Sequence, residues 1–483
     1  MRTSFTGQVL VLGCGAVSRC LLPLLHDHLN LDFARLTILD FEDVRAHIRP
    51  VLEAGARFVQ HRITPENLTA TLQQYLSSGD LLIDLAWNID ALELLTWCRT
   101  RNVLYINTSV EVWDPYINLE DRPPMERTLY ARHMDLCHHI ASWSADGPTA
   151  VLEHGANPGL ASHWARRGLE DLSAATLDQG ALDDVRRTQL EQALADSDYA
   201  RMAMHTGVKV IHISERDSQI ASLPKRVDEF VNTWSVEGFY EEGIAPAELG
   251  WGTHERRLPA LAHVPSYGPG NAICLAQMGV QTWVRSWVPG GEILGMVVRH
   301  GEAFTLSDFL TVWENDRPIY RPTVHYAYLP TDAALASLHE LRMNAYDMQS
   351  KTRIMNNEII DGKDELGVLL LGHALTGWWT GSQLDIHEAR RLAPGQNATT
   401  LQVAASIIGA LDWMLRHPRC GVCMPEDLPH HEILAVANPL LGPSPSLQTD
   451  WTPLRARWDA FARFGAPAPS PEDVWQFETF LAN

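Results

Sequence analysis

The sequence predicts an α/β fold, in which a Rossmann-type doubly wound parallel sheet precedes an α+β domain with a mixed sheet. Three observations lead to this prediction. Apolar runs alternate with amphipathic segments over the first 110 residues. A glycine-rich loop follows the first apolar run directly. The length of 483 residues exceeds what one ordinary core fills, so we expect two domains.

Five apolar runs predict the strands of the first domain. They are QVLVLG (8–13), LTILD (36–40), ARFVQHRI (56–63), LLIDLA (81–86) and VLYINTS (103–109). Helical patterns separate most of them, which is the rhythm of a doubly wound sheet. A helical pattern over 128–141 and a loop over 153–159 then indicate a hinge, so the first domain is expected to span 1–155.

Short β-rich runs separated by Gly and Pro turns predict the mixed sheet of a second domain over 156–398. They are VKVIHISER (208–216), FVNTWSVEGF (230–239), TWVRSWV (282–288) and ILGMVVRHGE (293–302). Helices are predicted at 160–169 and 399–417. Residues 441–483 are expected to form a tail with a Pro-rich connector and a short terminal helix.

Composition narrows the function classes. The formal charge of −21 disfavours nucleic acid, whose phosphates would be repelled, and suits a cationic small molecule, although solubility alone also accounts for such acidity. No apolar run reaches the roughly 18 uninterrupted residues of a membrane helix, so no membrane span is expected. Seven scattered cysteines fit a reducing cytoplasm. Cys420 and Cys423 form a lone C-x-x-C, and no metal site is expected there.

A dinucleotide fingerprint follows the first predicted strand. Gly13 permits the tight turn, and Gly15 lets a pyrophosphate approach the backbone. Ser18 stands where a third small residue keeps helix and strand close, in place of the usual Gly or Ala. With Ala16 and Val17, these residues open a helix whose N-terminus faces the phosphates.

Asp40 ends the second predicted strand, where a carboxylate accepts the hydroxyls of the adenosine ribose and favours NAD over NADP. Arg45 and Arg49 follow closely and leave a 2′-phosphate open as the alternative. Asn107 and Thr108, at the end of the fifth predicted strand, complete the expected cofactor site. The alternative is that this loop is an ordinary glycine turn in an α/β fold that binds no dinucleotide.

Acidic and aromatic residues gather between 215 and 255. Trp234 precedes Glu237 and Glu242 in WSVEGFYEE, and Glu215 lies a little before them. Hydride abstraction beside an amine leaves a cation, which carboxylates and an indole face stabilise. Alternatively, the acids form a solvated surface and the tryptophans pack in the core without a catalytic role. For Trp234 we favour the catalytic role.

His300 and Glu302 are predicted to close a strand, with both side chains on one face, as an acid/base and an ammonium anchor or as a structural pair. The adjacent pairs His138-His139 and His430-His431 are expected to point apart, which disfavours zinc. The G-x-S-x-G and H-E-x-x-H motifs are absent from the sequence, so serine-hydrolase and zincin chemistry are not expected.

With these residues in view, the sequence resembles the bacterial homospermidine synthases of the saccharopine dehydrogenase-like superfamily over essentially its whole length. The segments that carry the resemblance are VLGCGAVS (11–18), NTSVEVWDPY (107–116), EHGANPGLASH (153–163), ISERDSQ (213–219), NTWSVEGFYEEGIAPAELGWGTHE (232–255), RHGEA (299–303) and TTLQVAASIIGALDWML (399–415). Each motif alone is weak, and together they are highly specific.

The resemblance implies NAD as a recycled hydride carrier, putrescine and spermidine as substrates, and a cytoplasmic homodimer. It implies that residues 156–398 bind substrate and form the dimer, and that about 399–440 completes the Rossmann domain. One putrescine would be oxidised to an imine and coupled to a second with loss of ammonia, and the Schiff base would be reduced to homospermidine. By the same resemblance, the catalytic residues are Trp234, Glu237 and His300, and the substrate-binding residues are Glu111, Asn157, Glu215, Glu242 and Glu302.

Two competing functions remain at this stage. A saccharopine or carboxynorspermidine dehydrogenase would need arginine forks for substrate carboxylates, for which Arg216, Arg285 and Arg299 are candidates. A non-catalytic NAD-binding sensor would keep the glycine loop alone.

Overall fold

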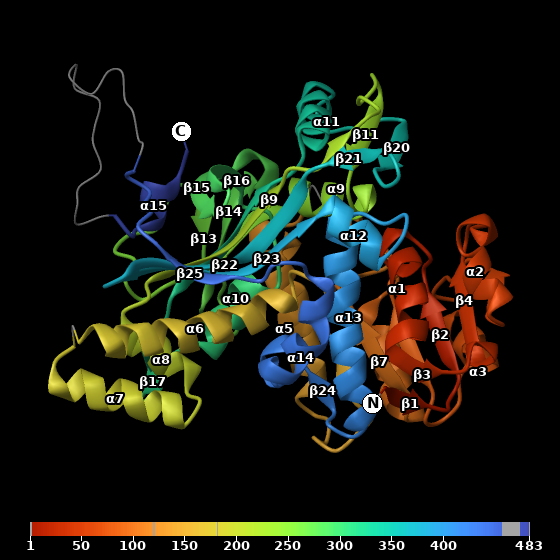
Figure 1. Ribbon diagram of the computed structural model, residues 1–483, viewed down its shortest axis with the longest axis horizontal. Coiled ribbons are helices and arrows are strands. Elements are labelled where there is room, and N and C mark those ends of the chain that lie inside the picture. The colour runs from red at the N-terminus through yellow and green to blue at the C-terminus, as the bar shows by residue number, and fades with distance from the viewer. Residues whose placement is uncertain (1, 119–120, 181, 456–473, 483) are drawn as a thin grey trace.

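Two sheets organise the chain. A computed structural model describes residues 2–118, 121–180, 182–455 and 474–482. Figure 1 shows a parallel sheet built mainly from the N-terminal region and a mixed sheet built from the middle of the chain. Helix α13 (Ala398–Arg416) contacts both sheets and packs against α1 (Ala16–His28). The predicted fold class is confirmed.

The first sheet has seven strands, all parallel, in the order β24-β8-β7-β6-β2-β4-β5. Their bounds are β2 Val9–Leu12, β4 Leu36–Asp40, β5 Arg57–Gln60, β6 Leu81–Asp84, β7 Leu104–Asn107, β8 Ala150–Val151 and β24 Val422–Cys423. All five predicted strands form. Four are short apolar runs that the sheet largely buries, and β5 is a partly exposed strand at its edge. The chain re-enters this sheet at β24, beside β8.

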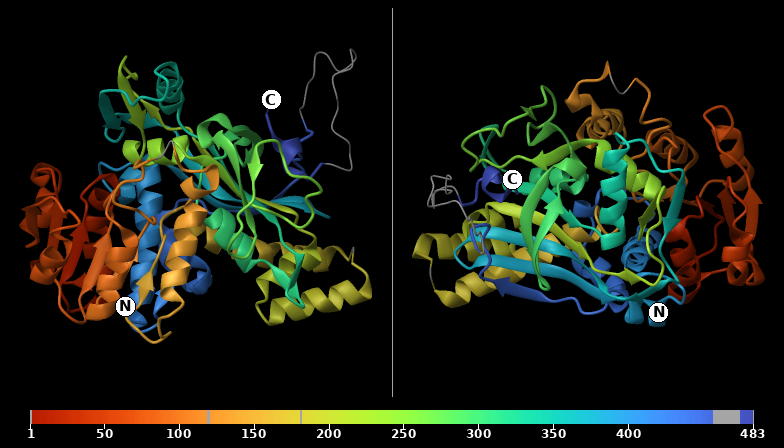
Figure 2. Two further views of the ribbon diagram at one scale, coloured as in Figure 1. Left: turned by 180° about the vertical axis from the view of Figure 1, so that it is seen from behind. Right: turned by 90° about the horizontal axis from the view of Figure 1, so that it is seen from above.

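Helices cover both faces of the parallel sheet, as Figure 2 shows from behind and from above. Besides α1 and α13 they are α2 Arg49–Glu53, α3 Leu68–Tyr75, α4 Ala91–Arg101, α5 Leu129–Ile140 and α14 His430–Ala437. Two short strands, β1 (Thr3–Phe5) and β3 (Leu29–Leu31), pair with each other outside the sheet.

Helix α13 has the length and mean hydropathy, 1.3, of a membrane span. In the described part of the chain it is the one helix with both properties. However, 83% of that window is buried inside the protein, so α13 is a core helix.

The second sheet has ten strands. Its main path is β13-β14-β12-β19-β9-β22-β23-β25, and the hairpin β15-β16 joins it at β19. The bounds are β9 Val210–Asp217, β12 Pro246–Gly250, β13 Ala262–His263, β14 Ala272–Met278, β15 Trp283–Val288, β16 Gly291–Met296, β19 Thr323–Leu329, β22 Lys363–His373, β23 Thr376–Asp385 and β25 Ser446–Thr449. Only β9 and β19 pair in parallel within it, so the sheet is mixed, as predicted.

Helices and smaller strands surround this second sheet. The helices are α6 Leu160–Gln179, α7 Asp184–Ala195, α8 Tyr199–Thr206, α9 Val236–Ile244, α10 Glu302–Phe309, α11 Asp332–Met343, α12 Ile386–Leu392 and α15 Phe477–Phe480. The strands are β10 Ile220–Ala221, β11 Glu229–Asn232, β17 Val312–Glu314, β18 Arg317–Tyr320, β20 Lys351–Ile354 and β21 Ile359–Asp361. The Pro-rich connector predicted within the tail lies largely outside the described residues.

Two of the predicted β runs are partly wrong. The run over 230–239 is a strand only to Asn232, because Ser235 caps α9 by accepting a hydrogen bond from the Gly238 amide at 3.0 Å. The run over 293–302 stops at Met296, and Glu302 begins α10 instead of ending a strand. Both errors follow from apolar stretches that do not distinguish a buried strand from a buried helix.

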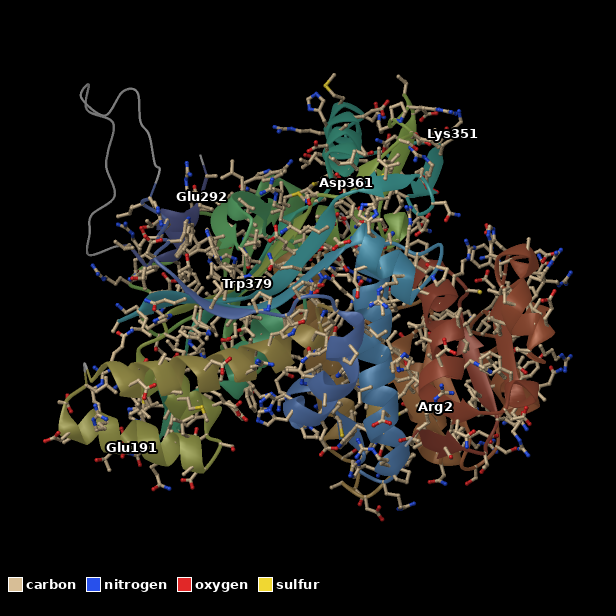
Figure 3. All side chains as sticks on the ribbon, viewed as in Figure 1. Arg2, Glu191, Glu292, Lys351, Asp361 and Trp379 are labelled. Atoms are coloured by element: carbon tan, nitrogen blue, oxygen red, sulfur yellow. The ribbon has the colours of Figure 1, made fainter. Side chains whose placement is uncertain are left out.

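The core is continuous between the two sheets. Apolar side chains of α1, α13, α6 and the facing strands of both sheets form one buried cluster. Trp379 of β23 lies near the middle of the view in Figure 3 and is fully buried, while the labelled Glu191 and Lys351 lie toward the edges of the molecule and are exposed. This shared core holds the carboxyl ends of the parallel strands against the second sheet.

Candidate active site

A cavity of about 860 Å³ lies at the carboxyl ends of β2, β4 and β6. The loop between β2 and α1 forms one wall. Gly13 adopts φ +82, and a Cβ there would lie 2.6 Å from the Leu85 carbonyl oxygen, so only glycine fits. A Cβ at Gly15 would meet no atom of the described residues within 4 Å, which leaves the backbone open toward a ligand. Ala16 and Val17 also line this cavity.

Ser18 and Asp40 hold the glycine loop in place. The Ser18 hydroxyl donates to the Gly13 carbonyl at 2.6 Å. Asp40 accepts hydrogen bonds from the amides of Cys14 at 2.6 Å and Glu42 at 2.8 Å. Each carboxylate oxygen has further acceptor capacity, and Asp40 lines the cavity, so it remains placed for a ribose hydroxyl.

The arginine at the far end of this cavity is one that the sequence reasoning missed. Arg62 lines the cavity, and its guanidinium lies 4.3 Å from the centre of the Phe41 ring. Arg45 and Arg49, the sequence candidates for a 2′-phosphate, are not among the lining residues. Arg45 instead pairs with Asp43 at 3.2 Å. Arg62 was hidden because it follows β5, the third strand, and not the second.

A smaller cavity of about 210 Å³, here called the catalytic pocket, adjoins the first. Val17, Leu85, Ala86, Trp87 and Ser235 line both cavities. The end of a ligand that lies along the glycine loop would therefore reach the catalytic pocket. The predicted site residues that line this pocket are Thr108, Glu111, Asn157, Glu215, Trp234, Glu242 and His300.

Trp234 is positioned by the start of α9. Its indole N–H donates to the Tyr328 hydroxyl at 3.1 Å, and its ring lies 5.5 Å from the ring of Phe239. A Cβ at Gly238 would come 3.2 Å from the Trp234 ring, so the glycine allows the indole to lie against the helix. Gly238 and Glu242 share one helical face toward the pocket, as their spacing of four requires.

Glu215 and Asn157 meet at the end of β9. The Glu215 carboxylate accepts hydrogen bonds from the Tyr326 hydroxyl and, at 3.4 Å, from the Asn157 amide. Burial raises the pKa of Glu215 to about 8, against an ordinary value of 4.5. The buried Asp217 nearby raises it further. A cation that enters the pocket would favour the ionised carboxylate and take the place of this proton.

His300 and Glu242 face each other from different elements. His300 Nε2 lies 3.7 Å from Glu242 Oε2, and the imidazole contacts the Tyr326 ring edge-on at 4.4 Å. Burial lowers the pKa of His300 to about 3, with a further contribution from Arg299, so its imidazole is neutral. Burial also raises the pKa of Glu242 well above its ordinary range. Neither His300 Nδ1 nor Glu242 Oε2 has a hydrogen-bond partner among the described residues.

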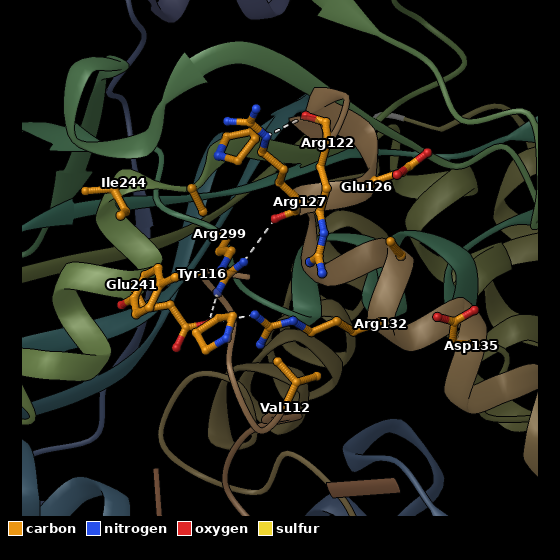
Figure 4. A pocket seen from close by; sticks show the side chains of 14 residues that line it. Val112, Tyr116, Arg122, Glu126, Arg127, Arg132, Asp135, Glu241, Ile244 and Arg299 are labelled. Atoms are coloured by element: carbon orange, nitrogen blue, oxygen red, sulfur yellow. Dashed lines mark hydrogen bonds and ion pairs between the residues drawn. The ribbon is translucent and has the colours of Figure 1, made fainter. Parts of the chain in front are cut away.

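One wall of the catalytic pocket is an ion cluster. Glu241 accepts a hydrogen bond from Arg132 at 2.7 Å, another from Arg299 at 2.5 Å, and a third from the Trp87 indole at 3.1 Å. Figure 4 shows the two arginines converging on Glu241. These three charged side chains also line a third cavity of about 190 Å³ on their other side.

Glu111 completes the acidic lining. Ser109 donates to one of its carboxylate oxygens at 2.8 Å, and the other has no partner within the described chain. Burial raises the pKa of Glu111 to about 7, and the nearby Glu241 adds to this shift. The catalytic pocket therefore brings five carboxylates around one small volume, those of Glu111, Glu153, Glu215, Glu241 and Glu242.

Three predicted site residues lie elsewhere. Glu237 lines the larger cavity and not the catalytic pocket. Asn107 is buried below both cavities, where its side chain accepts from the Glu153 amide at 2.8 Å and donates to the Tyr105 hydroxyl at 3.1 Å. Glu302 is 1% exposed at the start of α10, beside Glu153, and lines neither cavity. The same-face argument for His300 and Glu302 is wrong because no strand contains them.

Other residues of the pocket were not singled out from the sequence. They are Tyr326, Glu153, Trp87, Arg132 and Glu241. Tyr326 lies in β19 and pairs with Ile213 of β9, which places it next to Glu215. Such a residue can be recognised only from the pairing of two strands that lie more than 100 residues apart in the sequence. A local sequence pattern does not contain this information. Glu241 was visible only as one acid in a run of acids.

The arginine forks proposed for a carboxylate substrate are occupied or distant. Arg299 is bound to Glu241 and to the Arg127 carbonyl, and these partners leave no fork directed at the pocket. Burial alone would lower the pKa of Arg299, but Glu241 and neighbouring carboxylates outweigh burial and raise it. Arg285 pairs with Glu292 at 2.6 Å, and Arg216 binds the Gly290 carbonyl. Neither Arg285 nor Arg216 lines the pocket.

Comparison with known proteins decides the family. Residues 9–151 match the saccharopine dehydrogenase NADP binding domain, and residues 155–443 match the saccharopine dehydrogenase C-terminal domain. The homospermidine synthase of Blastochloris viridis is 40% identical, with 99% of this chain and 98% of that protein covered. The chain belongs to the homospermidine synthase family. The homospermidine synthase of Mesorhizobium japonicum is 38% identical, with 99% and 97% covered.

A solved homospermidine synthase has the same fold. The crystal structure of the Legionella pneumophila enzyme in complex with NAD superposes with a TM-score of 0.88 at 37% identity, and 100% of this chain and 99% of that chain are covered. The resemblance inferred from the motifs is therefore confirmed for the whole length. This chain thus joins a dinucleotide-binding domain and a saccharopine dehydrogenase C-terminal domain.

Proposed function

We propose that this chain is an NAD-dependent homospermidine synthase that converts two putrescines to homospermidine and ammonia, and that also accepts spermidine as an aminobutyl donor. The observation that carries the proposal is the carboxylate lining of the catalytic pocket, where five glutamates and Trp234 surround a small volume beside the glycine loop. Such a lining suits a diamine and the cation formed from it.

The larger cavity suits a dinucleotide. Gly13 and Gly15 shape the loop before α1, whose N-terminus suits a pyrophosphate, and Asp40 lines the same cavity, so we assign it to the adenosine ribose. NAD, when bound, supplies a hydride acceptor and later a hydride donor. Asp40 favours NAD, since a carboxylate repels a 2′-phosphate, although Arg62 is close enough to the same end of the cavity to make NADP the competitor to test.

Amine binding depends on the acidic lining. We assign Glu215 and Asn157 to one ammonium group of the donor and Glu111 to the entering second putrescine. A primary amine has a pKa near that of lysine, about 10.4, and must lose a proton before a hydride can leave. The Glu242–His300 pair is the proposed proton acceptor, because burial raises the pKa of Glu242, which makes its carboxylate a stronger base, and the neutral imidazole can relay the proton.

Stabilisation of the cation is assigned to Trp234. An indole face over a desolvated cation is worth about 2 kcal/mol. Oxidation of the first putrescine gives an imine, the amine of the second adds to its carbon, and ammonia leaves. The resulting Schiff base accepts a hydride to give homospermidine, so two putrescines become one homospermidine and one ammonia. The Trp87–Glu241 hydrogen bond fixes the indole of Trp87 in the lining that the two cavities share, where its apolar ring helps to exclude water from the imine.

The pocket fits a dehydrogenase of carboxylated substrates less well. The two arginines that line the pocket in the described part of the chain, Arg132 and Arg299, are both bound to Glu241, which makes them poor partners for a substrate carboxylate. We also propose, from the family resemblance, a homodimer in the cytoplasm. Light scattering should then give twice the chain mass of 54.0 kDa.

The experiment is an incubation of purified protein with putrescine and catalytic NAD, without NADH, and mass spectrometry of the products. Homospermidine and ammonia in equal amounts support the proposal. An absolute need for a keto or carboxylated co-substrate would indicate the dehydrogenase alternative. NAD binding without any amine turnover would indicate a sensor.

A further inference from the structure

Two adjacent histidines converge on one carboxylate where α14 meets α6. His430 Nε2 lies 3.2 Å from Glu170 Oε2, and His431 Nε2 lies 3.3 Å from Glu170 Oε1. The two imidazole rings are 3.8 Å apart. The expectation that these histidines point apart is therefore wrong. They occupy the first turn of α14, where side chains lean back toward the helix N-terminus and both can reach across to α6.

The ligand atoms have the spacing of a metal site. Two imidazole nitrogens and a carboxylate oxygen make a donor set found in open zinc sites. At bond lengths of about 2.0–2.2 Å, tetrahedral ligand atoms are separated by about 3.3–3.6 Å. Each histidine nitrogen lies about one such edge from a different oxygen of Glu170, His430 at 3.2 Å from Oε2 and His431 at 3.3 Å from Oε1. One ligand atom from each of the three residues lies within 4.8 Å of the other two.

The surroundings hold the group in place and leave one side open. The Tyr199 hydroxyl donates to Glu170 at 3.0 Å and fixes the carboxylate. The side chain of His430 is only 3% exposed, whereas that of His431 is 72% exposed and faces solvent. Glu170, His430 and His431 are absent from the lining of the three cavities described above.

One positive charge lies nearby. Arg166 is close enough to affect His430, but its guanidinium is held by the carbonyls of Pro425 and Glu426 and by His163. It therefore does not occupy the position between the histidines and Glu170. Its charge opposes a cation, so the site should bind an ion more weakly than a closed structural zinc site does.

We propose that Glu170, His430 and His431 bind a divalent transition-metal ion of the zinc class, with water completing the coordination on the exposed side. The ion ties α14 to α6, outside the catalytic pocket. The proposal does not depend on the proposed reaction, because none of its residues touches the pocket.

The test is metal titration of the full-length, metal-stripped protein. The exposed thiols Cys137 and Cys420 are replaced by serine to remove competing ligands. Zn²⁺ is titrated by calorimetry, and Co²⁺ by its visible absorption, which reports tetrahedral nitrogen and oxygen ligands. We expect one ion per chain, an affinity loss of more than about tenfold in His431→Ala, and the same in Glu170→Gln. A higher melting temperature with Zn²⁺ should disappear in both variants.

The matched control is His138→Ala/His139→Ala, an adjacent pair on α5 without a shared carboxylate in the described structure. It should bind Zn²⁺ as the parent does. His431 is exposed, so its substitution leaves the fold intact even if Glu170→Gln does not fold. Absence of a one-to-one site in the parent, or binding that His431→Ala leaves unchanged, would overturn the proposal. Homospermidine formation should be equal in the parent and in His431→Ala.

Discussion

Trp234 shows how a single residue acquires its role from its neighbours. The chain leaves β11 at Asn232 and enters α9 at Val236, which leaves the indole in the lining of the catalytic pocket. Its N–H is fixed by Tyr328 from β19. The sequence indicated Trp234 from its acidic context, but the partner that orients it is 94 residues away and has no local signal.

Replacement of Trp234 tests the cation-stabilising role. Trp234→Ala should lower kcat about 30-fold, the equivalent of about 2 kcal/mol, because the cation loses the indole face. Trp234→Phe keeps an aromatic face and should lose less. The measurement is steady-state homospermidine production, with dinucleotide affinity expected to be unchanged. Trp313→Ala, at a tryptophan that is 46% exposed on β17, is the control. Equal activity of Trp234→Ala and the parent would contradict the role.

Glu215 gives a pH-dependent prediction. Its pKa is about 8 in the folded protein and near 4.5 in the unfolded chain. The folded state therefore binds the proton more tightly. Its contribution to stability is complete below about pH 4.5 and is lost as the pH rises through about 8.

Glu215→Gln should remove this dependence. Between pH 5 and 8 the parent should lose stability relative to Glu215→Gln, by on the order of a few kcal/mol, when unfolding of the amine-free proteins is compared. Conversely, the KM for putrescine should rise at least roughly tenfold in Glu215→Gln above pH 8, where the parent carboxylate is ionised. Parallel stability curves for the two proteins across this range would show that Glu215 is already ionised without substrate.

At the scale of elements, α9 arranges most of the pocket. Ser235 caps it, Gly238 makes room for the indole, and Glu241 and Glu242 point to the ion cluster and the pocket.

Gly238→Ala should leave the melting temperature equal or higher, since alanine favours a helix by about 1 kcal/mol over glycine. It should nevertheless lower kcat severalfold, because the new Cβ displaces the ring of Trp234. Ser235→Ala should instead affect stability more than kcat, with a loss of about 1 kcal/mol in the free energy of unfolding. Unchanged kcat in Gly238→Ala would mean that the indole position is not critical.

The glycine loop is the second decisive element. Gly13→Ala should weaken NAD binding at least about tenfold, because strain at φ +82 and the contact with Leu85 both distort the loop. Gly79→Ala is the matched control: its φ of +87 is similar, but no atom of the described residues lies within 4 Å of the added Cβ. It should cost stability and leave NAD affinity unchanged. Equal NAD affinity in Gly13→Ala and the parent, measured by calorimetry, would count against this cofactor site.

Element prediction from sequence succeeded where local pattern and tertiary environment agree. The five strands of the parallel sheet are short apolar runs with helices between them, and all five form. It failed at 230–239 and 293–302, where apolar residues continue from a strand into a buried helix. The cap at Ser235 was the available signal in the first case, and the acidic Glu302 before an Ala-Phe pair was a weaker signal in the second.

At the scale of the whole molecule, the active site exists because two sheets share one core. The parallel sheet carries the glycine loop, and β9 and β19 of the mixed sheet carry Glu215, Tyr326 and Tyr328. Motifs indicated both halves separately. The distance between the two halves of the site arises only from packing between distant segments. The same packing forms the ion cluster around Glu241 and the burial that raises the pKa of Glu111 to about 7.

The central claim is that one enclosed dinucleotide takes a hydride from an amine and returns it to the coupled product. The most direct measurement uses putrescine deuterated on both amine-bearing carbons, with an excess of unlabelled NADH in solution, and mass spectrometry of the homospermidine formed. We predict that the product retains every deuteron of the two putrescines. Loss of one deuteron per product, replaced by hydrogen from the added NADH, would contradict hydride return within a closed pocket.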